Sequence, residues 1–352
     1  MTTTLILPPE IQGLSAWYGP ETLTRDDWIE RLSSQEIDEI ERATKCLAAE
    51  SLDITAIRQH DFPLPILGPR IQRILDDLLN GRGFALIRSL PVDRWTGRES
   101  AIAFFGIGAH IGSARSQNAK GHALGHVKDL SKSSSDPNTR IYQTRERQTF
   151  HTDSCDVVAL LCLRPAKSGG QSSLVSSVTI FNEMRRQRPD LAAVLFNPVE
   201  TDRRGEIAPG QKPYFRIPVF NWHEGSLSTI YQRQYIESAR RYPEVPALTV
   251  TQTEAMDMFD SLANNPSLNM QMEFCPGDVQ LVHNHIILHD RMAFEDWIEP
   301  ERKRHLLRLW LAPANARPLP PVFAERYGSI IPGARGGVAA QSNKLIAPLD
   351  AE

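Results

Sequence analysis

Apolar and polar positions follow two different patterns along the chain, and the first of them occupies the N-terminal part. Over residues 25–50 and 71–79, apolar side chains recur every three or four positions, which is the spacing of one face of an α-helix. The largely apolar run FALIRSL at 84–90 predicts a buried strand. Pro91 should end it, because proline cannot continue a ladder of hydrogen bonds. A further apolar helix is predicted at 99–112.

The second pattern begins near residue 140 and consists of short runs of branched, aromatic and alternating residues, which are typical of β-strands. Two segments with helical spacing, 178–196 and 251–265, interrupt these runs, and the second is predicted to open with a capping box of Thr251 and Glu254. The strand-like runs lie at 140–152, 157–163, 172–177, 214–222, 227–236, 269–274, 279–283 and 304–312.

Many short strands joined by Gly- and Pro-rich turns, with helices outside the run, favour a mixed α+β fold built on a jelly roll. We therefore expect a double-stranded β-helix, cupin-like core with a helical N-terminal region and helical inserts. No repeat or low-complexity linker interrupts the chain, so residues 1–352 are predicted to form a single elaborated domain. Its parts would be a mostly helical region (1–112), the jelly-roll core (140–315) and a C-terminal extension (316–352).

Composition narrows the functional class. The 352 residues are 41% hydrophobic and 23% charged, with a formal net charge of −3, which is ordinary for a soluble globular protein and offers no basic excess for nucleic acid. No run of apolar residues is long enough for a membrane span. The N-terminus does not resemble a leader, and the four cysteines are scattered, so a reducing, cytoplasmic location is expected. A homo-oligomer is left open.

The stretch TFHTDSCD contains a candidate metal site. His151 and Asp153 would point to one face of an extended strand, although about one such pair is expected by chance among ten histidines and 42 acidic residues. A third ligand is offered by His283, His285 or His289, which spacing alone cannot separate. Two histidines and one carboxylate suit non-haem Fe(II), whereas structural zinc sites use four protein ligands.

Two arginines on the last predicted strand point to an acidic ligand. A strand at 304–312 would place Arg304 and Arg308 on one face with Leu306 and Trp310. A buried guanidinium without an anionic partner costs several kcal/mol, and arginine binds carboxylates through two parallel hydrogen bonds. A dicarboxylate ligand would meet this demand; surface arginines on an edge strand are the alternative.

In their order along the chain, these motifs resemble the taurine dioxygenase-like (TauD/TfdA) family of Fe(II)/2-oxoglutarate-dependent dioxygenases. The resemblance runs through GRGFALIRSLP, FHTD, RPAKSGGQSSLVS, GDVQLVHNHIILHDRMAFED and RKRHLLRLWL, and covers about 81–312. It implies that His151, Asp153 and His289 hold Fe(II). His283 and His285 would then line the site or serve the structure.

The resemblance also implies a co-substrate site. Arg304 and Ser172, which follows the Gly-Gly turn, correspond to the residues that bind 2-oxoglutarate. Arg308 would meet either the substrate anion or the co-substrate, and a longer insert before the two arginines leaves their assignment open. The implied reaction uses dioxygen, releases succinate and carbon dioxide, and removes hydrogen from a C–H bond by hydroxylation, desaturation or oxidative cyclisation.

The substrate is expected to be a small carboxylate or amino-acid-like molecule. Phe150 and Ser154 flank the metal motif, and the aromatic runs 211–222 and 229–236 could form walls. The resemblance assigns further substrate contacts to a polar stretch that contains Arg115, Gln117, Asn118 and Lys120. Two alternatives are a metal-dependent hydrolase or isomerase on a jelly roll and a binding protein without turnover.

Overall fold

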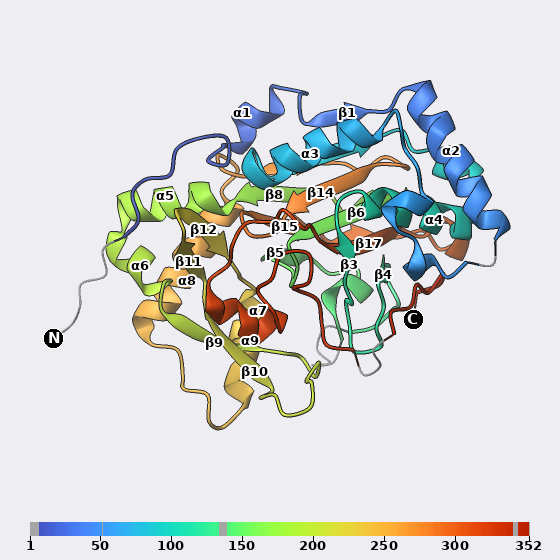
Figure 1. Ribbon diagram of the computed structural model, residues 1–352. Helices are drawn as coiled ribbons and strands as arrows, with labels where there is room; N and C mark the ends of the chain where they lie inside the picture. The colour runs from blue at the N-terminus through green and yellow to red at the C-terminus, as the bar shows by residue number, and fades with distance from the viewer. Residues whose placement is uncertain (1–6, 51, 134–138, 341–343, 352) are drawn as a thin grey trace.

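The computed structural model describes residues 7–50, 52–133, 139–340 and 344–351 (Figure 1). The first six residues, on which the expectation of no leader partly depends, lie outside these ranges. Among the described residues, none of the helices combines the length and the apolar character needed to cross a bilayer.

Two sheets face each other across a shared core, as the jelly-roll prediction requires. The larger sheet has the order β1-β2-β14-β6-β17-β3, with β4 also paired to β17. Its strands are β1 (Ile29–Arg31), β2 (Phe84–Arg88), β3 (Ser113–Ala114), β4 (Leu124–Val127), β6 (Val157–Arg164), β14 (Val279–His283) and β17 (His305–Ala312). The smaller sheet is antiparallel in the order β13-β8-β15-β5. It contains β5 (Gln148–His151), β8 (Ser172–Ser176), β13 (Met270–Met272) and β15 (Ile287–Arg291).

Three long helices cover the outer face of the larger sheet: α2 (Ser34–Ala49), α3 (Gly68–Asn80) and α4 (Gly97–Ala109) (Figure 1). Three others, α5 (Ser177–Gln187), α6 (Pro189–Val194) and α8 (Val250–Asn264), pack together at the opposite end. The remaining elements are α1 (Gly19–Leu23), β7 (Ser168–Gly169), β9 (Pro198–Asp202), β10 (Tyr214–Pro218), β11 (Phe220–His223), β12 (Ser226–Thr229), α7 (Arg233–Ser238), β16 (Phe294–Glu295) and α9 (Ala324–Tyr327), with short 3-10 turns between them.

Strand β17 shows how alternation along one strand serves two purposes. Leu307 and Leu309 belong to the apolar cluster beneath the helices, whereas Trp310 packs between the two sheets. Arg308 shares the inner face with Trp310 and is buried there. The predicted division of this strand into an apolar and an arginine-bearing face is confirmed.

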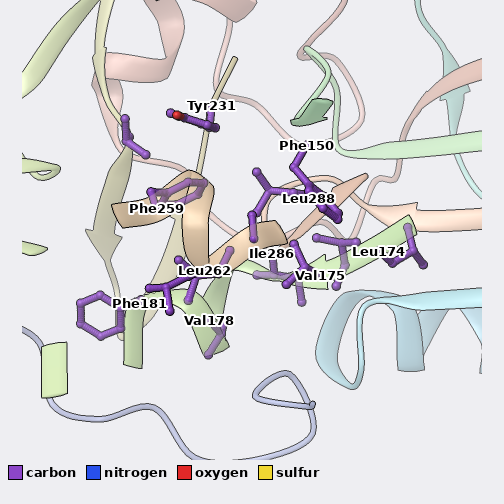
Figure 2. Packing of buried hydrophobic residues seen from close by; sticks show 14 of the residues in the cluster. Phe150, Leu174, Val175, Val178, Phe181, Tyr231, Phe259, Leu262, Ile286 and Leu288 are labelled. Carbon is purple, nitrogen blue, oxygen red and sulfur yellow. The ribbon is translucent and has the colours of Figure 1, made fainter. Parts of the chain in front are cut away.

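The core between the sheets is densely apolar where α5 and α8 meet the smaller sheet. Figure 2 shows Phe150, Leu174 and Leu288 from three neighbouring strands among these side chains. Phe181 and Phe259 from the helices close the same cluster. Burying such large side chains stabilises the sheet that carries the metal motif.

The helix predicted over 25–50 is wrong in its first part. Ile29–Arg31 form the strand β1, because Ile29 pairs in parallel with Leu86 on the edge of the larger sheet. The helix starts after Ser33, whose side chain forms a capping box with Glu36. Tertiary pairing therefore overrides the helical spacing of the preceding residues.

Three further boundaries differ from prediction. The capping box of α8 uses Thr249 and Gln252 rather than Thr251 and Glu254. The helical segment 178–196 is divided between Gln187 and Pro189, since proline cannot donate a hydrogen bond within a helix. The strand predicted over 227–236 ends at Thr229 and is followed by the helix α7.

Candidate active site

His151 and His289 lie directly opposite each other on the paired strands β5 and β15. Their ring centres are 4.1 Å apart. Asp153, which follows β5, approaches His151 Nε2 with one carboxylate oxygen at 3.9 Å and His289 Nε2 with the other at 3.8 Å. The candidate ligand atoms of all three residues lie within 4.8 Å of one another, so the structure brings together the predicted metal triad.

The chemistry of these donors fits a divalent metal. His151 Nδ1 donates to the carbonyl of Thr149 at 2.9 Å, which leaves its Nε2 as a lone-pair donor. That nitrogen accepts from the Gln148 amide at 2.8 Å, a contact that a bound cation would replace. Burial lowers the pKa of His151, and that of His289 to about 3, so both rings are neutral, as metal binding requires.

Asp153 is held as an anion. Burial alone would raise its pKa, but the Arg308 charge, the two histidines and the Trp310 hydrogen bond lower it to about 2. Trp310 Nε1 donates to the carboxylate at 2.9 Å and Arg308 Nη1 at 3.2 Å. Asn284, which sequence reasoning passed over, accepts from the Asp153 backbone N–H at 2.7 Å and donates back to its carbonyl.

His283 and His285 belong to a different environment. His285 Nε2 bonds to Asp156 at 2.8 Å, and the same carboxylate accepts from Arg335 at 2.9 and 3.1 Å. His283, His285, Asp156 and Arg335 are all fully buried. This cluster packs against the metal-bearing loop. Neither histidine joins the metal triad or borders the cavities beside it, so of the two roles predicted for them the structural one fits their positions.

A cavity on one side of the triad, here called the Arg304 cavity, is bordered by Ser172, His289, Arg291, Arg304 and Arg308 and by other residues of both sheets. Arg304 is only 3% exposed, and within the described residues its Nη1 has no hydrogen-bond partner. Burial lowers its pKa to about 10. The charge of Asp296 opposes this lowering, but among the described residues no ion pair joins Asp296 to the guanidinium, so the cavity favours a bound anion.

Other groups shape this cavity around Arg304. The guanidinium lies 5.2 Å from the ring centre of Phe294. Gly170 has φ of +73°, and a side chain there would place Cβ 3.3 Å from Arg304 Nε. Ser172 Oγ accepts from the amide of Gln280 at 3.1 Å and still borders the cavity. The Gly-Gly turn therefore fits closely against the arginine.

Arg291 is a second buried cation beside Arg304 and was missed from the sequence. Its guanidinium donates to the carbonyls of Thr144 and Glu146. Burial, together with the charge of Arg304, lowers its pKa to about 9. A ligand with more than one carboxylate would relieve both the missing partner of Arg304 and the repulsion between the two arginines.

A second cavity, here called the Arg326 cavity, opens on the other side of His151 and Asp153. The aromatic walls predicted from 211–222 and 229–236 are present as Phe215, Tyr231 and Tyr235. The cavity is also rich in charge, and its other charged residues are Arg140, Asp202, Arg203, Glu206, Arg308 and Arg326.

The predicted substrate residues divide between this cavity and other places. Gln117 borders it, and its Oε1 accepts from Arg308 Nε at 2.7 Å. Ser154 borders it too, and its hydroxyl accepts from Arg326 at 2.8 Å. The cavity contains the metal-proximal part of the polar stretch that the sequence indicated.

Four of the residues predicted to contact the substrate lie outside this cavity. Phe150 alternates with His151 on β5 and therefore points into the apolar core beside Leu288 (Figure 2). Arg115 donates to the carbonyls of Gly336 and Ala334 and borders a different cavity, against α4. Asn118 caps its own turn by accepting from the backbone of Lys120, and both residues border a neighbouring surface cavity instead.

Arg140, Arg203, Glu206 and Arg326 were missed because they come from loops and from the C-terminal segment, where no periodicity marks the direction of a side chain. Arg140 pairs with Glu206 and donates to the hydroxyl of Tyr235 at 2.6 Å. Burial alone would lower the pKa of Arg140, but its contacts with Tyr235 and Glu206 raise it.

Comparisons with known proteins identify the family of this chain. The sequence model of the taurine catabolism dioxygenase TauD, TfdA family matches residues 41–310. FR-33289 synthase of Streptomyces rubellomurinus is 32% identical over 324 residues, which cover 90% of this chain and 94% of the relative. A taurine hydroxylase-like protein, SAT17, of Stachybotrys chartarum is 30% identical over 304 residues, which cover 84% of this chain and 77% of the relative.

Solved structures share the fold. An asparagine oxygenase in complex with Fe(II), 3-hydroxyasparagine and succinate superposes with a TM-score of 0.64 at 15% identity, over 81% of this chain and 93% of its own. The non-haem iron oxygenase OrfP gives 0.61 at 15% identity, over 80% and 93% of the two chains. The predicted cupin-like jelly roll is confirmed by these matches.

Proposed function

This chain belongs to the taurine dioxygenase (TauD, TfdA) family and is a non-haem Fe(II)- and 2-oxoglutarate-dependent oxygenase, and on that premise we propose that it removes hydrogen from a C–H bond of a small anionic, amino-acid-like substrate. The metal is assigned to His151, Asp153 and His289. The observation that carries the proposal is the buried, unpartnered guanidinium of Arg304 in a cavity that both histidines also border.

Arg304 is assigned to the distal carboxylate of 2-oxoglutarate. Its planar guanidinium suits two parallel hydrogen bonds to a carboxylate, and Ser172 offers a hydroxyl in the same cavity. Arg308 is assigned to positioning rather than to the co-substrate, because its guanidinium already donates to Asp153 and Gln117. This assignment separates the two arginines that spacing along the strand could not.

Bound Fe(II) and 2-oxoglutarate supply the oxidising chemistry, in which dioxygen is consumed and succinate and carbon dioxide are released. The residues of the chain bind and orient. Trp310 and Arg308 keep the Asp153 carboxylate ionised and fixed in direction, and the Phe215 and Tyr231 walls of the Arg326 cavity limit how a substrate can approach the triad. Which C–H bond lies nearest the metal decides the outcome, and hydroxylation is our proposal among the three reactions.

The substrate class rests on the charge of the Arg326 cavity and on the names of similar proteins. Neighbouring structures hold 3-hydroxyasparagine and 3-hydroxy-L-arginine. A uridine-5'-phosphate dioxygenase of Streptomyces is 29% identical over 176 residues, which cover 48% of this chain. These ligands share a polar, charged head group, which is what arginines beside an open metal site would recognise.

The proposal is tested in two steps. Anaerobic addition of Fe(II) and then 2-oxoglutarate should produce the weak visible absorption of the chelate, and Arg304→Leu should require far more 2-oxoglutarate to reach the same absorption. Amino acids, small carboxylates and their phosphorylated derivatives are then screened by succinate formation, with mass analysis of any product. Succinate released without an oxidised product from every compound would contradict the proposed substrate class.

A further inference from the structure

The segment that follows β17 completes the Arg326 cavity, although it lies beyond residue 310, where the family match ends. It packs directly on the loop that carries Asp153. Gly337 N–H donates to the Ser154 carbonyl at 2.6 Å, and Arg335 forms its buried ion pair with Asp156 at 2.8 Å. Residues 313–338 are therefore anchored to the metal-bearing loop at both the backbone and the side-chain level.

This anchoring brings Arg326, on the short helix α9, to the cavity wall. The Arg326 side chain is 8% exposed. Its Nε donates to the neutral hydroxyl of Ser154 at 2.8 Å, and the nearest carboxylate that it meets within the described residues is Glu206, at 4.0 Å. Glu206 is held more closely by Arg140. The charge of Arg326 is thus only weakly compensated.

Arg203 borders the same cavity from the loop after β9. It donates to the backbone carbonyls of Lys212 at 3.1 Å and Glu325 at 2.5 Å, and in the described parts of the chain no ion pair joins it to a carboxylate. Both guanidinium groups lie beside the ring of Phe215, at 5.4 Å for Arg203 and 5.5 Å for Arg326. Burial and the charge of Arg326 lower the pKa of Arg203 to about 10.

Nearby carboxylates compensate these two charges only in part. Asp202 forms an ion pair with Arg241 at 3.1 Å. Asp153 is assigned to the metal and accepts a hydrogen bond from Arg308. Glu206 forms a closer ion pair with Arg140 than with Arg326. Two buried positive charges are left facing one cavity, and a singly charged group would compensate one of them only.

We propose that Arg203 and Arg326 form the specificity-determining site for a doubly charged tetrahedral oxyanion on the substrate, either a phosphate ester or a phosphonate. The inference rests on the proposed function for the location of the substrate but names a ligand chemistry beyond it. The oxyanion accepts from both guanidinium groups, and the carbon skeleton attached to it then extends toward His151 and Asp153, which border the same cavity. Because Arg326 comes from residues outside the family match, the preference would be particular to proteins with a similar C-terminal segment.

Small anions of one shape and different charge test this site. The protein is saturated with 2-oxoglutarate, so that the Arg304 cavity is filled, and titrated calorimetrically at a pH where methylphosphonate carries two charges. Methylphosphonate should bind about tenfold or more tightly than methanesulfonate, which has the same shape and one charge. Methyl phosphate, as a third arm, separates an ester from a phosphonate preference.

Variants assign the preference to the two arginines. Arg203→Gln and Arg326→Gln should each weaken methylphosphonate binding by about tenfold or more and reduce its advantage over methanesulfonate, whereas Arg326→Lys should keep part of it. Arg216→Gln is the matched control, because Arg216 lies on β10 next to Phe215 but is exposed and pairs with Glu200. The chelate absorption of each variant shows that its metal site is intact.

Two results would overturn the inference: equal binding of methylphosphonate and methanesulfonate to the unaltered protein, or unchanged methylphosphonate affinity in both glutamine variants. Failure of the proposed function gives a different pattern. In that case the chelate absorption is missing, or no screened compound is oxidised, while the preference for the doubly charged anion still depends on Arg203 and Arg326.

Discussion

The two cavities on either side of His151 and Asp153 are built from different material. The Arg304 cavity is enclosed mainly by strands of both sheets, and its arginines point inward from β15 and β17 or the residue just before it. The Arg326 cavity is enclosed mainly by loops, by α7 and by α9 of the C-terminal segment. The first therefore has walls whose positions are set by sheet hydrogen bonds, and the second has walls set by loop packing.

This difference matches the tasks proposed for the two cavities. A co-substrate common to a family needs the same geometry in each member, which a sheet provides, whereas substrates differ and loops can change without disturbing the core. The charges agree with this division. Arg304 is an incompletely compensated cation in the Arg304 cavity, and Arg203 and Arg326 are incompletely compensated cations in the Arg326 cavity. Substitutions in each cavity, and at the metal triad between them, test whether the two cavities have these separate tasks.

The largest effect is expected at the boundary itself. His151→Ala or His289→Ala should abolish stoichiometric Fe(II) binding and succinate formation, because two remaining ligands cannot hold the metal in place. Iron bound per chain after anaerobic gel filtration measures this. His223→Ala, on the hairpin of β11 and β12, is a control that should retain iron. His285→Ala should retain iron as well. Loss of iron from this variant would contradict the assignment of His289 as the third ligand.

The next effect separates the two cavities. Arg304→Leu should raise the apparent KM for 2-oxoglutarate about 30-fold or more, from the roughly 2 kcal/mol or more that a buried charged hydrogen-bond pair contributes. The KM for the substrate should change far less. Without 2-oxoglutarate the variant should unfold at a temperature no lower than the parent, because an uncompensated buried charge has been removed. A larger change in the substrate KM would transfer the co-substrate role to Arg308.

A smaller effect concerns the support of β17, the strand of the Arg304 cavity. On its outer face, Arg164 lies 3.3 Å from His305 Nδ1, and His305 Nε2 lies 2.7 Å from His126. Burial, with the charges of His126 and Arg164, lowers the pKa of His305 to about 3. At pH 3–6.5 the native state thus binds fewer protons than the unfolded chain. The contribution of His305 to the free energy of unfolding is therefore complete above this window and falls as the pH is lowered through it.

Between pH 7 and 5 this group should account for at most about 2 kcal/mol of lost stability. Urea unfolding of the parent and of His305→Gln across that range measures it, because the variant keeps a polar side chain but cannot titrate. The two stability curves should converge toward pH 5. Parallel curves would show that His305 titrates normally and that β17 is anchored by other contacts.

The smallest effect tests the fit of the Gly-Gly turn against Arg304. Gly170→Ala should cost about 1 kcal/mol of stability, since the left-handed conformation disfavours a side chain, and should raise the 2-oxoglutarate KM a few-fold as the new methyl displaces Arg304. Gly225→Ala is the matched control, because Gly225 has φ of +76° and open space around it. It should show the stability loss without the KM change; equal KM values in the two variants would mean that the turn does not position Arg304.

The sequence predicted the strand-borne part of the site well. A period of two along a strand predicted that His151 and Asp153 share a face and that Arg304 and Arg308 share another. The choice of His289 and the role of the Gly-Gly turn came from the family resemblance, because spacing could not separate the three histidines. Phe150 shows how the same rule was misapplied, because a residue adjacent to His151 on a strand must point to the opposite face. Its large apolar ring then enters the core.

From the sequence came the family, the jelly roll and a set of candidate residues for the metal and the co-substrate, because the order of motifs along the chain and the spacing within a strand are local properties. Tertiary structure alone decided that Arg203 and Arg326, more than a hundred residues apart, share one wall, and that Glu206 is already occupied by Arg140. Loop packing and the partition of charges depend on which distant residues come together, and no periodicity in the chain records that outcome.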